Sequence, residues 1–408
     1  MVTNKEQNKQ NVPHLRFPEF HGEWEKHGLS EYLDFKNGLN PDSKRFGKGI
    51  KFISVMDILN NPVITYDCIR ASVQATDAEI SSFSVENGDI LFQRSSETLE
   101  DVGRANVYID DKVAVFGGFV IRGKKKANYN PLFFRYLLSS PYARKRIIPM
   151  GAGAQHFNIG QEGLSKVLLN FPSIEEQTKI ASLLHLLDER IATQSKLIED
   201  LKKLRSAISK YLFARKDLLE TTICLSNIAT LKNGYAFQSG KYNALGKWKI
   251  LTITNVPGER YINDEVCNCI INLPDDIQDH QVLKEGDILI SLTGNVGRVS
   301  LCKDGDYLLN QRVGLLQLAK NVNQEFLYQI LSSQKFENSM IACGQGAAQM
   351  NIGKRDVESY VLPYSSNGNN ILWIAKILHS YDECIINEQR RLTLLTMQKQ
   401  YLLAQMFI

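Results

Sequence analysis

The sequence predicts an α+β fold with two pseudo-symmetric α/β globular halves, separated by two long antiparallel helices that form an intramolecular coiled coil. Three observations support this prediction. Residues 173–213 carry apolar side chains at alternating spacings of four and three, a similar pattern returns 194 residues later, and short β-rich runs precede both helical stretches. We therefore interpret the 408-residue chain as an internal duplication in which one long helix closes each half.

The first long helix is predicted to begin after Pro172. Ser173 and Glu176 have the spacing of a capping box, in which each side chain bonds the backbone N–H of the other residue. The alternating spacing places one apolar stripe along the helix, which is typical of a coiled-coil seam. Gln194 and Arg205 are polar residues within this seam. Its apolar positions are Ile180, Leu184, Leu187, Ile191, Ile198, Leu201, Ile208 and Leu212.

The second long helix repeats the seam near the C-terminus. Its polar positions are Glu388 and Lys399, and each lies 194 residues after a polar position of the first seam. In an antiparallel pair, Arg205 is expected opposite Glu388, and Gln194 is expected opposite Lys399. Polar pairs of this kind fix the register of a coiled coil. The apolar positions are Ile374, Leu378, Tyr381, Ile385, Leu392, Leu395, Leu402 and Met406.

These patterns divide the chain into five segments. They are a polar N-terminal arm (1–21), a first globular domain (22–172), a first long helix (173–215), a second globular domain (216–366) and a second long helix (367–408). The expected strands are residues 51–55, 89–92, 113–121, 249–254, 287–292 and 314–318. Residues 39–86 and 235–284 show no visible similarity, although the flanking sequences match, so we interpret them as divergent inserts in a shared framework.

A glycine-rich loop precedes each long helix. Residues 151–160 and 344–353 share the pattern Gly-x-Gly-Ala-x-x-x-Asn-Ile-Gly. Glycine at this density favours positive φ or close backbone approach, which indicates a shaped loop. The loops carry amide and imidazole groups that can bond bases, namely Gln155, His156, Gln345 and Gln349. For Asn158 and Asn351 a structural role, tying the loop to the start of the long helix, is at least as good an explanation.

Composition limits the class of protein. Apolar residues make up 43% and charged residues 23%, which is ordinary for a globular protein, and the net charge of +4 does not by itself indicate nucleic-acid binding. No run of about 18 apolar residues occurs and the first ten residues are polar, so we expect a cytoplasmic protein with no membrane span. Seven scattered cysteines argue against a disulfide framework, and Cys267 with Cys269 lacks the further ligands of a zinc site.

A search for catalytic motifs finds almost nothing. The sequence has no Asn/Asp-Pro-Pro-aromatic tetrad, no P-loop, and no Pro-Asp followed at a suitable distance by acidic-x-Lys. His185 and His379 occupy equivalent positions in the two seams, and we interpret them as packing residues and not as ligands. Asp382 and Glu383 are interpreted as a solvated pair.

Basic and aromatic residues alternate after residue 121. Such a mixture suits nucleic acid, because cations neutralise phosphates and aromatic rings stack on bases. A solvated helix face is the alternative. The residues are Arg122, Lys124, Lys125, Lys126, Tyr129, Phe133, Phe134, Arg135, Arg144, Lys145 and Arg146.

The run from Phe171 to Gln177 reads Phe-Pro-Ser-Ile-Glu-Glu-Gln and leads into the first long helix. With this run, the duplication, the two glycine loops and the paired helices, the chain resembles the specificity subunit of type I restriction-modification systems over nearly all of its length. Each motif alone is common, and the resemblance rests on their order. One departure is that residues 364–370, which lead into the second helix, lack Glu-Glu-Gln.

The resemblance implies a non-catalytic DNA-binding subunit. In that family two target-recognition domains each read half of an interrupted double-stranded DNA sequence, and the helices form a spacer that docks two methyltransferase (modification) subunits, joined by two restriction (motor and nuclease) subunits. S-adenosylmethionine, ATP and Mg belong to those partners, so no cofactor or metal is expected in this chain. We expect DNA contacts from Arg94, Arg104, Lys124, Lys125, Lys126, Gln155, His156, Thr293, Asn295, Arg298, Gln345 and Gln349. Spacer and partner contacts are expected from Leu184, Leu187, Ile191, Leu201, Arg205, Leu378, Ile385, Glu388 and Leu395.

Two other classes of function remain open. An enzyme with a fused methyltransferase or nuclease activity would need a catalytic motif inside the divergent inserts. A coiled-coil adaptor without DNA contact would have no reason to vary those inserts while keeping the framework.

Overall fold

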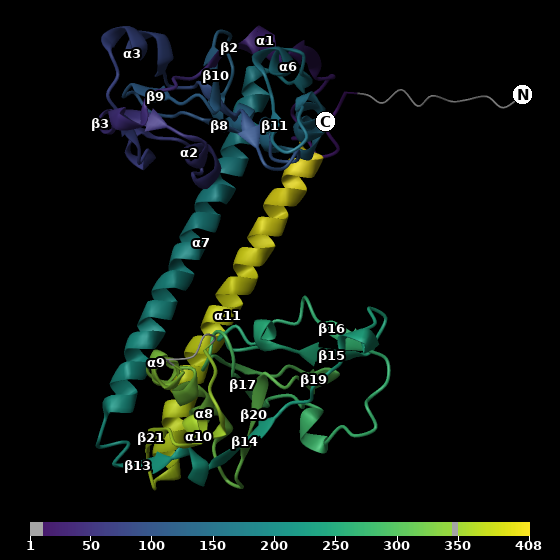
Figure 1. Ribbon diagram of the computed structural model, residues 1–408. Coiled ribbons are helices and arrows are strands. Elements are labelled where there is room, and N and C mark those ends of the chain that lie inside the picture. Colours follow the sequence, from purple (N-terminus) through teal and green to yellow (C-terminus); the bar gives the residue numbers. More distant parts are fainter. Residues whose placement is uncertain (1–10, 345–349) are drawn as a thin grey trace, which may run out of the picture. The chain divides into compact units, whose positions relative to one another are not determined.

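The computed structural model describes residues 11–344 and 350–408 (Figure 1). Contacts divide the chain into two compact units, which are treated separately below. The first unit comprises Met1–Ser195 and Arg391–Ile408, and the second comprises Lys196–Arg390. Each unit thus contains one globular domain and one end of each long helix. Among the described residues, we find no helix with both the length and the apolar character needed to cross a membrane.

The two long helices are α7 (Ile174–Ala214) and α11 (Gly368–Gln405). Every apolar seam position predicted from the sequence is buried or partly buried. In the first unit the beginning of α7 packs with the end of α11, and in the second unit the end of α7 packs with the beginning of α11. The helices are therefore antiparallel in each unit, as predicted.

The start of α7 differs in detail from the predicted capping box. The hydroxyl of Ser173 accepts the N–H of Glu176 at 3.4 Å. The Glu176 carboxylate, however, accepts two hydrogen bonds of 2.8 Å from Arg16. The N–H of Leu15 also donates to the carbonyl of Gln405 at 2.9 Å. The described part of the predicted N-terminal arm is thus packed against the ends of both long helices in the first unit.

The framework of the first unit is an antiparallel sheet with strand order β2-β10-β6-β8. Its strands are β2 (Leu33–Asn37), β10 (Val120–Lys125), β6 (Ile90–Gln93) and β8 (Ala105–Val107). Two further pairs are β1 (Glu25–Gly28) with β12 (Leu168–Phe171), and β7 (Ser95–Ser96) with β11 (Phe157–Asn158). The framework helices are α1 (Leu29–Tyr32), α4 (Pro131–Ser139), α5 (Pro141–Ile147) and α6 (Gln161–Ser165).

The insert of the first unit adds a second sheet, ordered β4-β3-β9-β5, in which β3 and β9 run parallel. The elements of the insert are β3 (Phe46–Ile53), α2 (Val55–Asn60), β4 (Ser72–Val73), α3 (Asp77–Phe83) and β5 (Ser84–Val85), and β9 (Ala114–Phe116) joins the sheet from outside the insert. The predicted strand 113–121 is therefore two strands in two sheets, β9 and β10. The break lies at Gly117 and Gly118, where a Cβ atom would come within 2.6 Å of the Phe52 ring and 1.7 Å of Asn40 respectively.

The second unit repeats this framework as an antiparallel sheet ordered β14-β20-β17-β18. Its strands are β14 (Ala229–Asn233), β20 (Val313–Leu318), β17 (Ile288–Ser291) and β18 (Val299–Leu301), and β13 (Thr221–Cys224) pairs with β21 (Val361–Tyr364). Its helices are α8 (Gln324–Leu331), α9 (Gln334–Cys343) and α10 (Lys354–Glu358). The insert contributes β16 (Asn268–Ile270) and β15 (Trp248–Leu251) to a smaller sheet, which β19 (Tyr307–Leu309) completes from outside the insert.

The two frameworks agree at the level of single contacts. Asn130 caps α4 by accepting the N–H of Phe133 at 3.0 Å, and Asn323 caps α8 by accepting the N–H of Phe326 at 2.8 Å. A Cβ atom on Gly38 would lie 2.1 Å from a backbone oxygen, and one on Gly234 would lie 2.2 Å from the equivalent oxygen. The duplication is therefore conserved in geometry.

The inserts share more than the sequence comparison predicted. β3 runs parallel to β9, and β15 runs parallel to β19. β9 and β19 are equivalent, since each directly precedes the last strand of its framework sheet, β10 or β20. The turn after each strand is closed in the same way, because the N–H of Ser54 donates to Asp57 at 2.7 Å and that of Thr252 donates to Asn255 at 2.8 Å. The inserts predicted to be divergent therefore share one strand and the turn after it, a stretch in which apolar and polar types match but few residues are identical.

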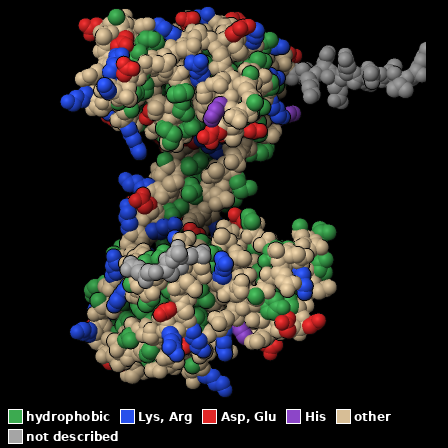
Figure 2. All heavy atoms as spheres, viewed as in Figure 1, with side chains coloured by type: hydrophobic (Ala, Val, Ile, Leu, Met, Phe, Trp, Pro, Cys, Tyr) green, Lys and Arg blue, Asp and Glu red, His purple; other side chains and the backbone are tan. Residues whose placement is uncertain are grey.

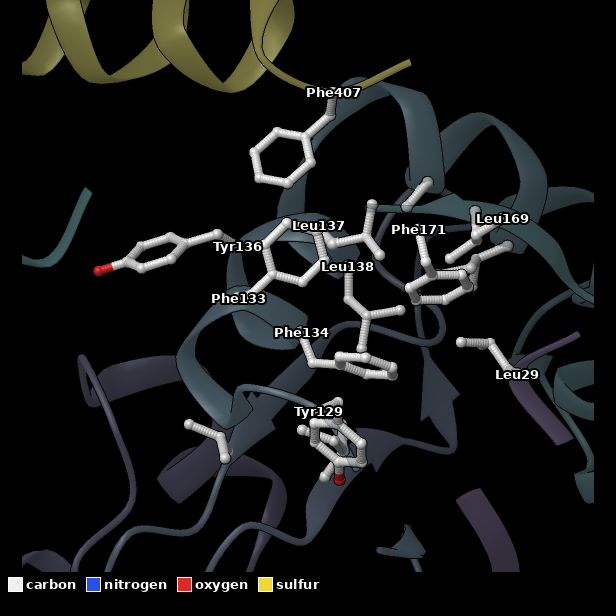
Figure 3. Close-up of a cluster of buried hydrophobic side chains, with 14 of the residues drawn as sticks. Leu29, Tyr129, Phe133, Phe134, Tyr136, Leu137, Leu138, Leu169, Phe171 and Phe407 are labelled. Carbon is white, nitrogen blue, oxygen red and sulfur yellow. The ribbon is translucent and has the colours of Figure 1, made fainter. Parts of the chain in front are cut away.

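The core of the first unit joins its globular domain to the end of the chain (Figure 3). Phe407, which follows α11, points toward Phe133 of α4, with ring centroids 5.6 Å apart. Trp24 contacts both rings edge-on, at centroid distances of 6.3 and 6.1 Å. Burial of such aromatic side chains contributes on the order of 2–3 kcal/mol each. The C-terminal residues are thus part of the first core.

Candidate nucleic-acid interface

A loop junction forms at one end of the framework sheet in the first unit. At the end of β6, the Gln93 carbonyl accepts the N–H of Gly103 at 2.9 Å, and Gly103 adopts a φ of 68°. The following carbonyl, that of Arg94, accepts the N–H of Ile159 from the glycine loop at 2.9 Å. The hydroxyl of Ser95 donates to the side-chain oxygen of Asn158. The glycine loop is thus bound to the end of a strand.

The second unit has the same junction. The Ser291 carbonyl accepts the N–H of Gly297 at 2.9 Å, and the Leu292 carbonyl accepts the N–H of Ile352 at 2.9 Å. The hydroxyl of Thr293 donates to the side-chain oxygen of Asn351 at 3.3 Å. Asn158 and Asn351 do have a structural role, but they tie the loop to the sheet and not to the start of the long helix. The sequence missed this because the partners lie 63 and 58 residues away along the chain.

Four predicted DNA-contacting residues of the first unit lie around this junction. Arg94 donates to the Gly118 carbonyl at 3.2 Å, so it also holds the turn between β9 and β10. Arg104 precedes β8 and is exposed, with Asp101 at 2.5 Å. Gln155 and His156 are exposed in the glycine loop. The structure brings these four residues to one end of the sheet.

The three predicted lysines lie at the other end of that sheet. In β10, Val120 pairs with Gln93, whereas Lys124 and Lys125 are at the far end of the strand. Lys124 forms an ion pair of 3.0 Å with Glu86, and Lys125 donates to the Tyr129 carbonyl at 3.1 Å. Lys126 is exposed next to them. These lysines and the glycine loop therefore form separate patches.

The alternating basic and aromatic residues do not form a stacking surface. Tyr129, Phe133 and Phe134 are at most 2% exposed and belong to the core in Figure 3. Arg122 is 6% exposed and packs on the Phe116 ring. The base-stacking interpretation is therefore wrong for the three aromatic residues, which pack in one core with residues of α7 and α11. Lys145 and Arg146, in contrast, are exposed on α5, as on a solvated helix face.

In the second unit, Thr293, Asn295 and Arg298 lie in the turn between β17 and β18. The Asn295 carbonyl accepts the Ser291 hydroxyl, and Arg298 lies 3.4 Å from Glu337 of α9. Gln345 and Gln349 lie outside the described residues. In each unit, Lys and Arg side chains are interspersed with Asp and Glu in the view of Figure 2.

The polar contacts between the long helices differ from the predicted pairs. Lys399 contacts Asp188 at 2.5 Å in the first unit, and Arg205 contacts Asp382 at 3.0 Å in the second. From the first pair to the second, the position on α7 advances by as many residues as the position on α11 goes back. This is the relation expected for two antiparallel helices. The predicted partner of Arg205, Glu388, is displaced by six residues from Asp382. The predicted register was therefore wrong, because it assumed that polar residues of the seam face one another.

Each aspartate is the centre of a buried polar cluster. Asp188 also accepts the Tyr136 hydroxyl at 2.9 Å and lies 3.1 Å from Arg135. Asp382 accepts the Gln329 amide at 2.6 Å and lies 3.1 Å from Arg260, whose side chain is 8% exposed. The interpretation of Asp382 as solvated was wrong. Sequence analysis could have found both aspartates, since they are 194 residues apart, like the polar seam positions. Arg260 could not be found in this way, because it lies in a divergent insert that has no matching sequence in the first half.

His185, His379 and Asp264 have structural partners. His379 lies 2.9 Å from Arg260 and 3.6 Å from Glu325, while His185 lies 3.6 Å from Glu189. Lys249 and Lys303 hold the pKa of Asp264 far below its ordinary value. Across residues 11–344 and 350–408, no group of three or more His, Cys, Asp or Glu side chains could hold a metal ion.

Comparison with known proteins identifies relatives along the whole chain. Residues 21–203 and 220–397 each match the family described as the Type I restriction modification DNA specificity domain. The Type I restriction enzyme MjaVIII specificity subunit of Methanocaldococcus jannaschii is 24% identical, and the match covers 82% of this chain and 80% of that protein.

Two solved structures share the fold. The S subunit of the type I restriction-modification system from M. genitalium has a TM-score of 0.59 at 17% identity, covering 97% of this chain and 99% of that one. A chain from a structure on complex assembly and conformational transition of the type I R-M system has a TM-score of 0.58 at 14% identity, covering 93% and 96%. At these identities the likeness concerns the fold alone.

Proposed function

Since the chain belongs to the type I restriction-modification DNA specificity family and is a DNA-sequence specificity subunit, we propose that its two units each read one half of an interrupted double-stranded DNA site. The observation that carries this proposal is the pairing of a repeated framework with different inserts. The frameworks agree in sheet order, helix caps and glycine contacts, whereas the inserts differ in their helices and strands. A framework present twice supports two readers of one kind.

The same observation supports an asymmetric site. The first insert contains α2 and α3, while the described part of the second insert has short 3-10 turns such as Ile253–Asn255 in their place. Base edges are read by specific side chains in the groove, so different inserts select different bases. The half-sites are therefore expected to differ in sequence, with an unread gap between them.

Within each unit, the loop junction is the proposed DNA-contacting region. In the first unit it presents Arg94, Arg104, Gln155 and His156, which supply guanidinium, amide and imidazole groups for phosphates and bases. In the second unit it presents Thr293, Asn295 and Arg298. We assign Lys124, Lys125 and Lys126 to a separate phosphate contact, because they lie at the other end of the sheet.

The long helices are the proposed docking surface for two modification subunits, with two restriction subunits joining the complex. This is supported by large apolar side chains that α7 and α11 leave exposed although their seams are buried. They are Leu186, Leu197, Leu204, Tyr211, Leu372, Trp373, Leu394, Met397 and Tyr401. We propose that this chain is not catalytic, since its sequence carries none of the catalytic motifs sought above.

A domain exchange tests the two-reader proposal. Residues 25–170 are replaced by the corresponding domain of a relative that retains polar residues at positions 135 and 136, because these contact Asp188 of α7. Methylome sequencing of a host carrying this chain and its modification partner is expected to show a new first half-site with the second half-site and gap unchanged. An exchange that alters both half-sites would contradict independent reading.

The non-catalytic proposal has its own test. The purified chain, incubated with S-adenosylmethionine or ATP and Mg plus its DNA site, is expected to give neither methyl transfer nor cleavage. Turnover that a point substitution in this chain abolishes would overturn the proposal.

A further inference from the structure

The first unit contains a cavity lined by three arginines. Its volume is about 420 Å³, and Arg104, Arg135 and Arg144 line it together with Glu100 and the insert residues Ile58 and Asn61. The cavity thus lies where the framework meets the insert. Arg135 is compensated by Asp188 at 3.1 Å, and Arg104 by Asp101 at 2.5 Å.

Arg144 differs from the other two arginines. Its Nη2 atom donates to the backbone carbonyls of Glu100 and Val102 at 2.8 and 2.7 Å. Its Nη1 atom is buried and has no hydrogen-bond partner among the described residues. Burial, together with the nearby charge of Arg104, lowers the pKa of Arg144 to about 10. A buried guanidinium donor without an acceptor is costly, which sets Arg144 apart from the two arginines that have carboxylate partners.

The second unit has a different residue at the position equivalent to Arg144. Gly103 packs against Ile147 of α5, and Gly297 packs in the same way against Met340 of α9, each with a virtual Cβ contact of 2.6 Å. This equivalence places Arg298 at the position of Arg104. It also places an acid, Glu337, at the position of Arg144.

The charge arrangement is therefore different in the two units. Arg298 and Glu337 form an ion pair of 3.4 Å in the second unit. In the first unit two guanidinium groups meet at the same place. Asp101 compensates Arg104 in the first unit, so what differs between the units is the partner at the position of Glu337: among the described residues, no carboxylate forms an ion pair with Arg144.

We propose that the first unit binds a phosphate group in this cavity, between Arg104 and Arg144. A tetrahedral dianion supplies beside Arg144 the negative charge that Glu337 supplies in the second unit, and guanidinium groups bind phosphate through paired hydrogen bonds. The source is either a phosphate of the DNA backbone, in which case the inference rests on the proposed function, or free phosphate. A backbone phosphate would position the first unit on DNA without contributing to base selection.

The first test measures thermal unfolding of the full chain in inorganic phosphate and in chloride of equal ionic strength. Binding to the folded chain raises Tm in phosphate. The wild-type chain is expected to show this shift, and Arg144→Met and Arg104→Gln are expected to lose it. Arg146→Met is the matched control, because Arg146 is on the same helix but stacks on Tyr142 and does not line the cavity. The Arg104 substitution keeps the test decisive if Arg144→Met does not fold.

The second test identifies the source. DNA affinity is measured as a function of salt on a duplex carrying the chain's own site. If the phosphate belongs to DNA, Arg144→Met lowers the slope of log affinity against log salt by about one and leaves base preference unchanged. An unchanged slope with a lost phosphate shift assigns the site to free phosphate.

The inference is overturned if phosphate does not raise the Tm of the wild-type chain above its value in chloride. It is also overturned if Arg144→Met and Arg104→Gln show the same rise in Tm as the wild-type chain. This failure is distinct from failure of the proposed function, in which the wild-type chain would not bind its DNA site selectively whatever the outcome of the phosphate assay.

Discussion

The polar clusters around Asp188 and Asp382 are built from equivalent positions but are completed by different parts of the chain. In the first unit Asp188 contacts Lys399, and in the second unit Asp382 contacts Arg205. Lys399 and Arg205 are 194 residues apart, as are the two aspartates. The contact between the long helices is thus a repeated feature of the framework.

The difference lies in the additional cation. Arg135, beside Asp188, comes from the framework helix α4, whereas Arg260, beside Asp382, comes from the insert of the second unit. Arg260 also forms hydrogen bonds of 2.8 and 2.7 Å to Glu325 of α8. The second insert is therefore fastened directly to a long helix, which makes its position depend on the spacer.

The largest effect is expected from Asp382→Ala. This change leaves Arg205 and Arg260 without their shared carboxylate, and removal of one partner from a buried ion pair costs about 3–5 kcal/mol. Asp188→Ala is expected to cost less, about 2–3 kcal/mol, because Lys399 is more exposed and can reach water. Urea unfolding followed by circular dichroism measures both free energies. The control Glu383→Ala alters a more exposed neighbour and should cost under about 1 kcal/mol; an equal loss in all three variants would contradict the special role of the aspartates.

Arg260→Met tests the link between insert and spacer. We expect a loss of about 2–3 kcal/mol, smaller than for Asp382→Ala because Arg205 still neutralises Asp382. The variant is also expected to weaken discrimination at the second half-site only, as measured by binding to duplexes with single base changes. Arg135→Met is the matched change in the first unit. If it disturbs the second half-site as strongly as Arg260→Met does, the proposed link is incorrect.

A pH series examines the first cluster alone. Burial by itself would raise the pKa of Asp188, but the hydrogen bond and charge of Lys399, with Tyr136 and Arg135, outweigh burial and hold the pKa below its ordinary value. The stabilisation is therefore complete above the unfolded pKa of about 3.9 and is lost as pH falls through the folded pKa. Unfolding free energies measured from pH 6 to pH 3 should decrease below about pH 4, with a shallower decrease in Asp188→Asn. Identical pH profiles for the two proteins would exclude this contribution.

The smallest effects are expected at the helix caps, where the units agree. Asn130→Ala and Asn323→Ala each remove an oxygen that accepts a backbone N–H, which costs about 1 kcal/mol. Because the caps are equivalent, the two losses in unfolding free energy should match within experimental error. A loss in one unit only would show that the frameworks differ in stability despite their shared geometry.

Most of the fold could be predicted from the sequence, but the candidate site only in part. The loop junction was partly anticipated, since Arg94, Arg104, Gln155 and His156 do lie together at one end of the sheet. Arg144 was noted only as one of several basic residues, because nothing local distinguishes a partly buried arginine from an exposed one on a short helix. Its importance becomes visible only beside Glu337, which requires the two units to be aligned in space.

The sequence by itself determined the duplication and the long helices, because these follow from periodicity along one chain. Tertiary structure alone decided which residues meet across the helices. An apolar seam is compatible with more than one register, since apolar contacts are not directional. Hydrogen-bonded charge pairs are directional. Asp188 and Asp382, which lie beside the seam, therefore select the register that the protein adopts. Residues of α4, α8 and the second insert complete the clusters around these two aspartates.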